Sequence, residues 1–427
     1  MRKILYSLAL AVPLFGQTLD EVVTYALTHA TAVAQAEAQS ELAALNRKQN
    51  RASMYGELDI VGSATHYNLD RTLAPLTPAV IASGQPVTTS KDLYFAGAAY
   101  SVPLFTGFAQ TRQVEMDKIA QKMADIRIHL TKEQLAYNVR ALYLGILSLK
   151  EIKKAQKSYI AALEKLTEMI AYEVRLGKKA KVDLLKSQSA LQDAKTNYAG
   201  IVANIKTTYA ALEALTGMKI DRLEPVAITV RRPNYDTQSL LSGVAGLSKV
   251  RVEQMQLQKA QKMIQKAKAA NYPQLAFNAS AGRNYGEDSA RNEWDAETLW
   301  QVGLNAKYNL LDFGKRSAAI QKAKISRLQA KLKKEQTLRD IRKDISQAIA
   351  KIEESYAAYL GNQTRHELSV QSAKIEQVRY ESDATTLNDL LLAKAKVQLS
   401  QSQLIQAKYD YQKNIYYLEY LLEKGVH

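Results

Sequence analysis

The sequence predicts a mainly α-helical chain, built as two copies of one architecture, with four β-strands of the length that crosses a membrane. Three observations predict this fold. The second half of the chain repeats residues of the first half, two stretches of nearly 70 residues contain almost no glycine or proline, and four short segments show strand-like alternation. We therefore expect one duplicated architecture rather than two or three unrelated domains.

The internal repeat has two parts. Residues around Leu58 recur 217 positions later around Leu275, and the long segment Leu104–Leu215 recurs 206 positions later as Leu310–Leu421. The offset falls by 11 across a single loop, so the two copies differ in the length of a hairpin loop. The matching positions of the long segment include Lys118, Ile119, Asp183, Leu184, Leu185, Leu212 and Glu213.

The first 17 residues are expected to form an export signal. Arg2 and Lys3 precede the apolar run Ile4–Phe15, which is too short to span a bilayer as a helix. A buried N-terminal helix is the alternative. The rest of the chain is expected to divide into a first copy (18–216), a connector (217–247), a second copy (248–423) and a short tail (424–427).

Helices are expected where apolar residues recur every three or four positions, as Leu338, Ile341 and Ile345 do. Two of these segments contain only a single glycine and no proline, so each predicts an uninterrupted helix of about 65–70 residues, roughly 100 Å long. Two shorter helices together match the length of one long helix, and we expect them to stack end to end beside it. The expected helices cover 18–54, 108–174, 182–216 and 315–386.

Strands are expected where polar and apolar residues alternate, as in the run from Trp300 to Asn305. These segments have the length of tilted membrane strands, about 10–13 residues each. Soluble hairpins with one core-facing side are the alternative. The expected strands cover 55–67, 93–102, 275–285 and 298–309, which form hairpins over 55–102 and 275–309. The aromatic residues expected at the membrane interfaces are Tyr94, Tyr100, Trp300 and Tyr308.

Four strands cannot close a membrane barrel by themselves. An open sheet edge in lipid leaves backbone N–H and C=O groups unpaired, which costs several kcal/mol for each group. If the strands cross a membrane, several chains must therefore contribute to one barrel. Two chains give eight strands and three chains give twelve.

Composition argues against several classes of function. Cysteine is absent, which excludes disulfides, thiolate metal sites, cysteine catalysis and a lipid-modified N-terminal cysteine. The five histidines lack metal-ligand spacing, and no glycine-rich loop has the context of a nucleotide site. The net charge of +16 comes from lysines spread along helices, so a solvated surface is favoured over nucleic-acid binding. We expect no enzyme, no metal and no cofactor.

Several segments, taken in order, resemble the TolC-like outer-membrane efflux family over essentially the whole mature chain. The resemblance implies a homotrimer whose twelve-stranded β-barrel, with four strands per chain, lies in the outer membrane. It also implies a long α-helical barrel in the periplasm, with the connector as its equatorial region. Many relatives carry an N-terminal lipidated cysteine, which this chain lacks. The segments that carry the resemblance are Thr18–Leu27, Arg251–Leu275, Val102–Phe108, Tyr308–Gly314 and the turns near Asp183 and Asp389.

The two helical turns, over 176–182 and 382–388, correspond to the family's periplasmic tip, which constricts the closed tunnel and meets the periplasmic adaptor. Asp389 matches a position where the family often places an inward acidic ring. Three carboxylates near one axis repel one another and attract cations. Helix N-capping is the alternative role for Asp389 and for its repeat counterpart Asp183.

Other residues of the turns depart from the family's pattern. Leu392 stands where some members carry a second acid, and Thr385 stands where an arginine is often found. Gly177 belongs to the first turn. The chemistry of the gate is therefore expected to differ in this chain.

The resemblance implies a passive exit duct of a tripartite efflux pump or a type I secretion system. Such a duct carries small toxic compounds or proteins from a periplasmic adaptor and an inner-membrane pump to the outside, and the pump supplies the energy. The alternative from another class is a secreted coiled-coil structural or adhesion protein whose hairpins are soluble.

Overall fold

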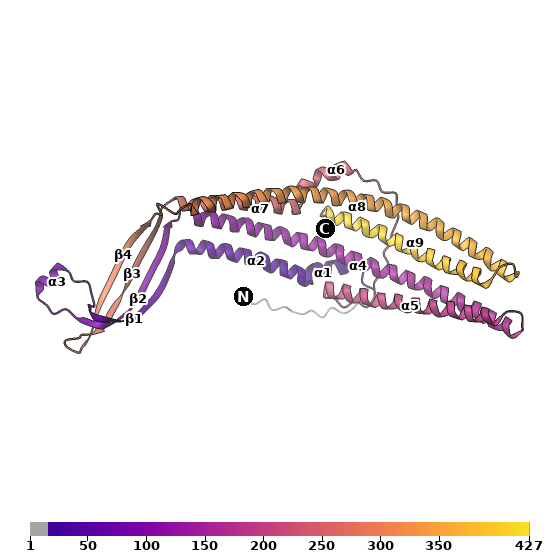
Figure 1. Ribbon diagram of the computed structural model, residues 1–427, viewed down its shortest axis with the longest axis horizontal. Helices are drawn as coiled ribbons and strands as arrows, with labels where there is room; N and C mark the ends of the chain where they lie inside the picture. The colour runs from indigo at the N-terminus through magenta and orange to yellow at the C-terminus, as the bar shows by residue number, and fades with distance from the viewer. Residues whose placement is uncertain (1–15, 427) are drawn as a thin grey trace. The chain divides into compact units, whose positions relative to one another are not determined.

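The computed structural model describes residues 16–426 of the chain (Figure 1). Apart from Gly16 and Gln17, the expected export signal lies outside these residues. The described residues form two compact units. We call residues 39–125 and 252–335 the strand unit. We call residues 16–38, 126–251 and 336–426 the hairpin unit, because it contains two helical hairpins, over residues 126–216 and 336–421. From here on, "the two hairpins" are these helical hairpins.

Long helices and one small sheet make up the chain. The strands are β1 (Glu57–Thr72), β2 (Thr89–Phe105), β3 (Gln274–Glu287) and β4 (Trp294–Lys307). The helices are α1 (Leu19–His29), α2 (Thr31–Ala52), α3 (Pro78–Ser83), α4 (Ala109–Arg175), α5 (Lys181–Thr216), α6 (Thr237–Ser242), α7 (Ser248–Lys268), α8 (Lys315–Glu381) and α9 (Leu387–Leu421). This confirms the predicted mainly helical fold with four strands.

The strand unit contains an antiparallel sheet with the order β1-β2-β3-β4. Residues directly opposite each other in antiparallel strands share a face of the sheet. Leu304 pairs with Phe277, which pairs in turn with Val102, so these three apolar side chains lie on one face. Asn305 pairs with Ala276 and lies on the other. Within the chain β1 and β4 are the two edges of the sheet.

All four strands are longer than the hydropathy pattern predicts. Backbone pairing continues past an irregularity after His66 as far as the Thr72–Thr89 pair, and β4 begins at Trp294. The outer ends of β1 and β2 lack the apolar alternation on which the prediction depended, because hydrogen bonds between main chains do not require it.

The two long helices each contain 67 residues. The expected single helix over 18–54 is wrong, because Ala30 has extended backbone (ψ 136°) and separates α1 from α2. No glycine or proline marks the break. Ala30 is itself buried, and α1 packs Val22 and Ala26 into a core with α4, whereas α2 buries only Val33. Tertiary packing overrides local helix propensity here.

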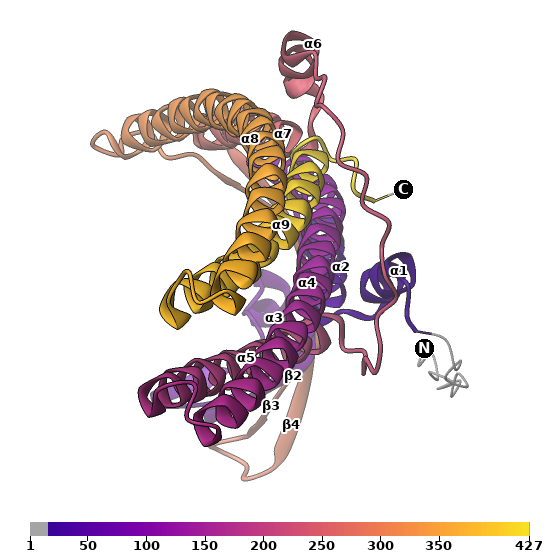
Figure 2. The same ribbon diagram turned by 90° about the vertical axis from the view of Figure 1, so that its right-hand side faces the viewer.

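In the hairpin unit, the connector and α6 lie on one face of the layer formed by α4, α5, α8 and α9 (Figure 2). Tyr143 of α4 donates its hydroxyl to the carbonyls of Gln17 (2.9 Å) and Glu224 (2.7 Å). Tyr411 of α9 donates its hydroxyl to the carbonyl of Arg231 at 2.6 Å. These buried tyrosines fix the connector to the helices at two points.

The end of the chain is held by two carboxylates of the same unit. The fully buried Glu133 side chain of α4 accepts hydrogen bonds from the N–H groups of Gly425 (2.9 Å) and Val426 (3.2 Å). The Glu423 carboxylate accepts hydrogen bonds from the first N–H groups of α7, beginning with Ser248 at 2.8 Å. The tail therefore joins helices from both copies of the repeat.

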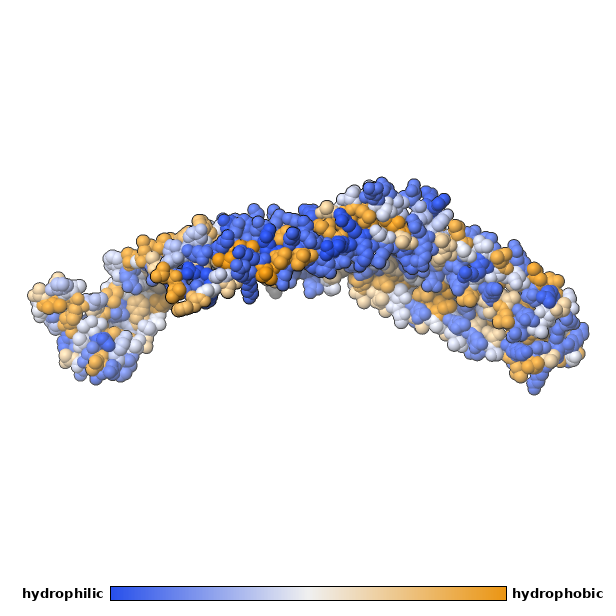
Figure 3. Space-filling model, turned by 45° about the horizontal axis from the view of Figure 1, so that its top comes forward, coloured by the Kyte–Doolittle hydropathy of each residue, from blue (hydrophilic) through white to orange (hydrophobic). Residues whose placement is uncertain are grey.

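The visible surface along the helices is mostly hydrophilic (Figure 3), as expected for lysines spread over solvated faces. None of the helices within residues 16–426 has an apolar stretch of the length needed to traverse a membrane.

Candidate functional site

The turns between α4 and α5 (first turn, 176–180) and between α8 and α9 (second turn, 382–386) have the same backbone. Gly177 and Asp383 occupy equivalent positions, 206 residues apart, and both are left-handed, with φ of 73° and 54°. Glycine adopts this conformation freely, whereas aspartate is one of the few other residues that visit it. In both turns the N–H groups of this residue and the next return to carbonyls of the preceding helix.

The second turn ends in a capping box. Thr386 is the N-cap of α9, and its hydroxyl accepts a hydrogen bond from the Asp389 N–H at 3.3 Å. The Asp389 Oδ2 atom accepts hydrogen bonds from the Thr386 hydroxyl (2.6 Å), the Thr386 N–H (3.3 Å) and the Thr385 hydroxyl (3.2 Å). These bonds, led by the one from the Thr386 hydroxyl, lower the pKa of Asp389.

Only one oxygen of the Asp389 carboxylate takes part in capping. No residue that the structure describes donates a hydrogen bond to Oδ1, and the side chain is exposed. Hydrogen bonds to Oδ2 therefore hold the carboxylate in place and favour its ionised form, while Oδ1 can bind a cation. Capping and an electrostatic role are compatible at this residue.

The first turn lacks this capping box. Ala180 is the N-cap of α5 and has no side-chain acceptor. Asp183, the repeat counterpart of Asp389, is half-buried and takes part in no side-chain hydrogen bond with the described residues. Its charge contributes to the raised pKa of Tyr380, for which burial is the main cause. Two aspartates that match in the sequence therefore have different surroundings.

A contact between the two turns involves residues that the sequence analysis missed. The Lys179 ammonium of the first turn forms an ion pair with the Asp383 carboxylate of the second, and lies 4.7 Å from the centre of the Tyr380 ring. The bond to Asp383 raises the pKa of Lys179. Lys179 is the repeat counterpart of Thr385. This difference between the two copies, lysine in one and threonine in the other, was the sequence feature that could have drawn attention to Lys179.

Beneath this contact lies a buried core. Tyr380 is only 4% exposed, and its hydroxyl has no hydrogen-bond partner among the described residues. One carboxylate oxygen of Glu173, whose charge acts on Tyr380, is also buried without a partner. Tyr380 of α8 packs in a cluster with apolar side chains of α4, α5 and α9: Leu163, Leu166, Ile170, Ala194, Leu387 and Leu390.

Apolar side chains are exposed near both turns. Leu176, Val182 and Leu185 are more than half exposed at the first turn, and Leu392 is 61% exposed at the second. Apolar residues appear on the surface at this end of the hairpins in Figure 3. A group of exposed apolar side chains is typical of a contact site for another protein.

The sheet brings together three of the expected interface aromatics. Its register places Tyr94, Tyr100 and Trp300 on the face that also carries Leu304. Trp300 lies at the seventh of fourteen positions rather than near a strand end, because pairing with β3 extends β4 to Trp294. Beyond Trp300, the same face carries the Arg283–Thr298 pair and then the Tyr285–Ala296 pair, so the interface position of Trp300 stays a prediction.

The strand ends carry further aromatic contacts. The Trp294 ring lies 5.6 Å from the ring of Tyr94. The fourth expected aromatic, Tyr308, lies just past the end of β4, half exposed and beside Arg316. Within residues 16–426, no group of three histidine, aspartate or glutamate side chains is placed to hold a metal ion.

Comparison with known proteins identifies this architecture. The family model described as "Outer membrane efflux protein" matches residues 22–218 and 248–422. No curated protein matches the chain by sequence.

Solved structures with similar folds are distant in sequence. The outer membrane channel CmeC of Campylobacter jejuni is 16% identical, with a TM-score of 0.79 over 95% of this chain and 86% of its own. The outer membrane protein VceC of Vibrio cholerae is 16% identical, with a TM-score of 0.78 over 96% and 97%. The open state of the Neisseria gonorrhoeae MtrE channel is 18% identical, with a TM-score of 0.74 over 96% and 89%.

Proposed function

This chain belongs to the outer membrane efflux protein family, and from that membership we propose that three copies form a passive exit duct through the outer membrane and the periplasm. The main structural support for the proposal comes from the sheet. One of its faces is apolar, and β1 and β4 are edges without partners in the chain. Such edges are costly in lipid, and strands from three chains close them in a twelve-stranded barrel.

The two faces of the sheet suit this role. The Leu304 face also carries Val302 and Phe277, which suit contact with lipid. The opposite face carries short polar side chains, and the Ser101 hydroxyl on it donates a hydrogen bond to the Asn278 amide oxygen at 2.9 Å. Hydroxyl and amide groups suit a hydrated lumen, and the same face carries the charged residues Glu57 and Asp59 on β1 and Glu297 on β4.

We propose that the two turns form the periplasmic gate. The Lys179–Asp383 ion pair joins the helical hairpins of one chain, and Asp389, in the first turn of α9, has a carboxylate oxygen to which no described residue donates a hydrogen bond. With three chains around an axis, three such carboxylates would attract cations to the closed end. The exposed apolar side chains at the turns, Leu176 and Leu392 among them, would meet a periplasmic adaptor.

The chain's part in export is that of a conduit. Its family is one of efflux channels rather than of enzymes, so the energy is expected to come from an inner-membrane pump that the adaptor joins to the duct. We propose small toxic compounds or secreted proteins as the cargo.

The test expresses the full-length chain in a bacterium that lacks its own outer membrane efflux protein. We expect the chain in the outer-membrane fraction, migrating as a heat-dissociable species that native mass spectrometry in detergent identifies as three chains. A stable folded monomer in that fraction would refute the barrel. Co-expression with a cognate adaptor and pump should restore resistance to toxic compounds or secretion of a protein, and correctly inserted trimers that restore neither would refute the duct.

A further inference from the structure

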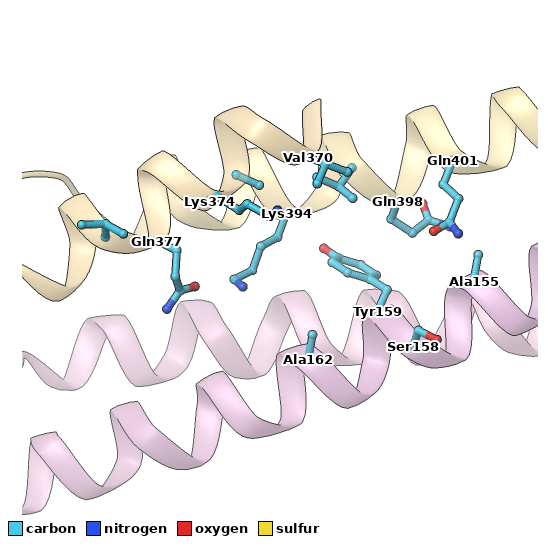
Figure 4. A pocket seen from close by; sticks show the side chains of 13 residues that line it. Ala155, Ser158, Tyr159, Ala162, Val370, Lys374, Gln377, Lys394, Gln398 and Gln401 are labelled. Carbon is cyan, nitrogen blue, oxygen red and sulfur yellow. The ribbon is translucent and has the colours of Figure 1, made fainter. Parts of the chain in front are cut away.

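A cavity of about 540 Å³ lies between the two hairpins, wholly within the hairpin unit. Its walls come from α4 of the first hairpin and from α8 and α9 of the second. In Figure 4, Tyr159 points from α4 and Lys394 from α9 into the same space between these helices. Sequence analysis singled out none of these residues, and the proposed gate does not use them.

The walls of the cavity are largely apolar. Ala155 is small, so the helices leave a space there instead of interlocking. The Tyr159 ring adds a flat aromatic surface on which a planar ligand can stack. A volume of this size accommodates a small organic molecule.

Lys394 is the unusual residue of this cavity. Its side chain is half-buried and forms no hydrogen bond or ion pair with any described residue; the Glu381 carboxylate acts on it only at a distance. Burial lowers the pKa of Lys394, because the apolar walls disfavour its charged form. A second lysine, Lys374, lines the same cavity and also lacks an ion-pair partner among the described residues. The site therefore has excess positive charge beside apolar surface.

Hydrogen-bonding groups beside Lys394 are partly occupied. The Gln398 amide nitrogen donates to the Gln156 amide oxygen at 2.5 Å and to the Ser402 hydroxyl at 3.1 Å. The Gln377 side chain projects into the cavity from α8 (Figure 4). Its amide nitrogen donates one hydrogen bond to the Glu381 carboxylate at 2.6 Å, and its second N–H can donate to a ligand oxygen.

We propose that this cavity binds a small organic anion, made of an apolar and preferably aromatic body with one carboxylate or sulfonate group. The acid group would pair with Lys394, and the body would lie against Tyr159 and the alanine wall. This inference deepens the proposed function, on which it rests, by naming a class of cargo that the duct would bind during export.

Charge decides between this ligand and others of the same size. A neutral ligand would cover Lys394 without compensating its charge, which is unfavourable. A cationic ligand would be repelled by both Lys394 and Lys374. The anion alone pairs with the ammonium while it removes apolar surface from water.

The test measures protection of one amine in the purified trimer in nonionic detergent. The trimer is acetylated with and without 2-naphthalenesulfonate, and mass spectrometry compares labelling of Lys394 with that of Lys396, an exposed lysine outside the cavity. We expect a several-fold slower acetylation of Lys394 and no change at Lys396. The matched probes 2-naphthalenemethanol and 2-naphthylmethylammonium should protect Lys394 weakly or not at all.

A second measurement uses equilibrium dialysis of the same sulfonate. We expect Lys394→Gln to bind it about tenfold more weakly, as for a lost charge-assisted hydrogen bond, and Lys396→Gln to bind it as wild type does. Equal labelling of Lys394 with and without the sulfonate would overturn the proposal, as would equal protection by all three probes. So would protection only by an added periplasmic partner, which would make the cavity a protein-docking groove. If trimers still restore export in any of these cases, only the ligand site fails, whereas loss of the trimer itself counts against the duct.

Discussion

The Lys179 ammonium pairs with the Asp383 carboxylate across the two turns, although the residues are 204 positions apart in the chain. The Tyr380 ring beneath the ammonium adds a cation–π contact. Each turn belongs to a different copy of the repeat, so this cluster joins the ends of the two hairpins directly.

Removing the charge of Lys179 should loosen the gate with little loss of overall stability. The Asp383 side chain is 80% exposed and the Lys179 side chain 20% exposed, so solvent screens the pair from the side of the carboxylate, and we expect it to contribute about 1 kcal/mol. We expect Lys179→Met to raise single-channel conductance in planar bilayers and to speed hydrogen exchange in both turns. Lys178→Met, which removes the neighbouring lysine without an ion pair, is the control. Equal conductance of the two variants would show that the pair does not restrain the gate.

The contribution of Asp389 to stability should depend on pH. Hydrogen bonds from Thr386 and Thr385 hold its pKa below the usual 3.8. Because the folded pKa is depressed, this contribution is present above pH 3.8 and is lost as the pH falls through the lowered value. Thermal melts of wild type and Asp389→Asn should differ at neutral pH and converge below 3.8. A difference that persists unchanged in acid would mean that the charge of Asp389 does not stabilise the cap.

The free Oδ1 atom of Asp389 should also govern cation block. Asp389→Asn retains much of the capping ability and removes the charge, so we expect weaker block of the channel by a trivalent cation in planar bilayers. Asp183→Asn is the matched control at the equivalent position of the first turn. If the trivalent cation blocks both variant channels as strongly as it blocks wild type, and Asp389→Ala only destabilises the trimer, Asp389 acts as a helix cap only.

Patterns within single segments predicted most of the fold. The near absence of glycine and proline predicted α4 and α8, and alternation predicted the middle of each strand. The break at Ala30 was not predictable in this way, because it depends on the packing of α1 against α4. The outer ends of β1 and β2 depend on backbone pairing with each other, which leaves no hydropathy pattern.

The candidate site, like the fold, was predictable only where a pattern within one segment pointed to it. The repeat and the family resemblance drew attention to Asp389 and Asp183, and the Thr386-to-Asp389 spacing fits a capping box. The Lys179–Asp383 pair forms between segments that only tertiary packing brings together. The residues around Lys179 in the sequence do not indicate that it forms an ion pair with a residue of the other copy.

The buried Glu133 carboxylate should be important for stability in the hairpin unit. Glu133→Ala leaves the N–H groups of Gly425 and Val426 without their acceptor, at a cost of about 1–3 kcal/mol for each buried group. Glu133→Gln keeps an acceptor and should cost less. Gly425→Ala should also destabilise, because an added Cβ would lie 2.8 Å from the Glu133 carboxylate. Chemical unfolding of the trimer measures the stability of the three variants. A Glu133→Ala variant as stable as wild type would contradict the prediction.

The register of β4 predicts which of two adjacent residues contacts lipid. Leu304 shares its face with Phe277 and Val102, whereas Asn305 pairs with Ala276 on the other face. An arginine on the lipid face near the bilayer midplane costs about 2–4 kcal/mol, and in the lumen it remains hydrated. We therefore expect Leu304→Arg to reduce the amount of heat-dissociable trimer in outer membranes, and Asn305→Arg to leave it near the wild-type level while lowering cation conductance. Because the two substitutions introduce the same side chain one residue apart, differences in expression or charge are controlled. Equal assembly of both variants would refute the face assignment, and loss of assembly in Asn305→Arg alone would reverse it.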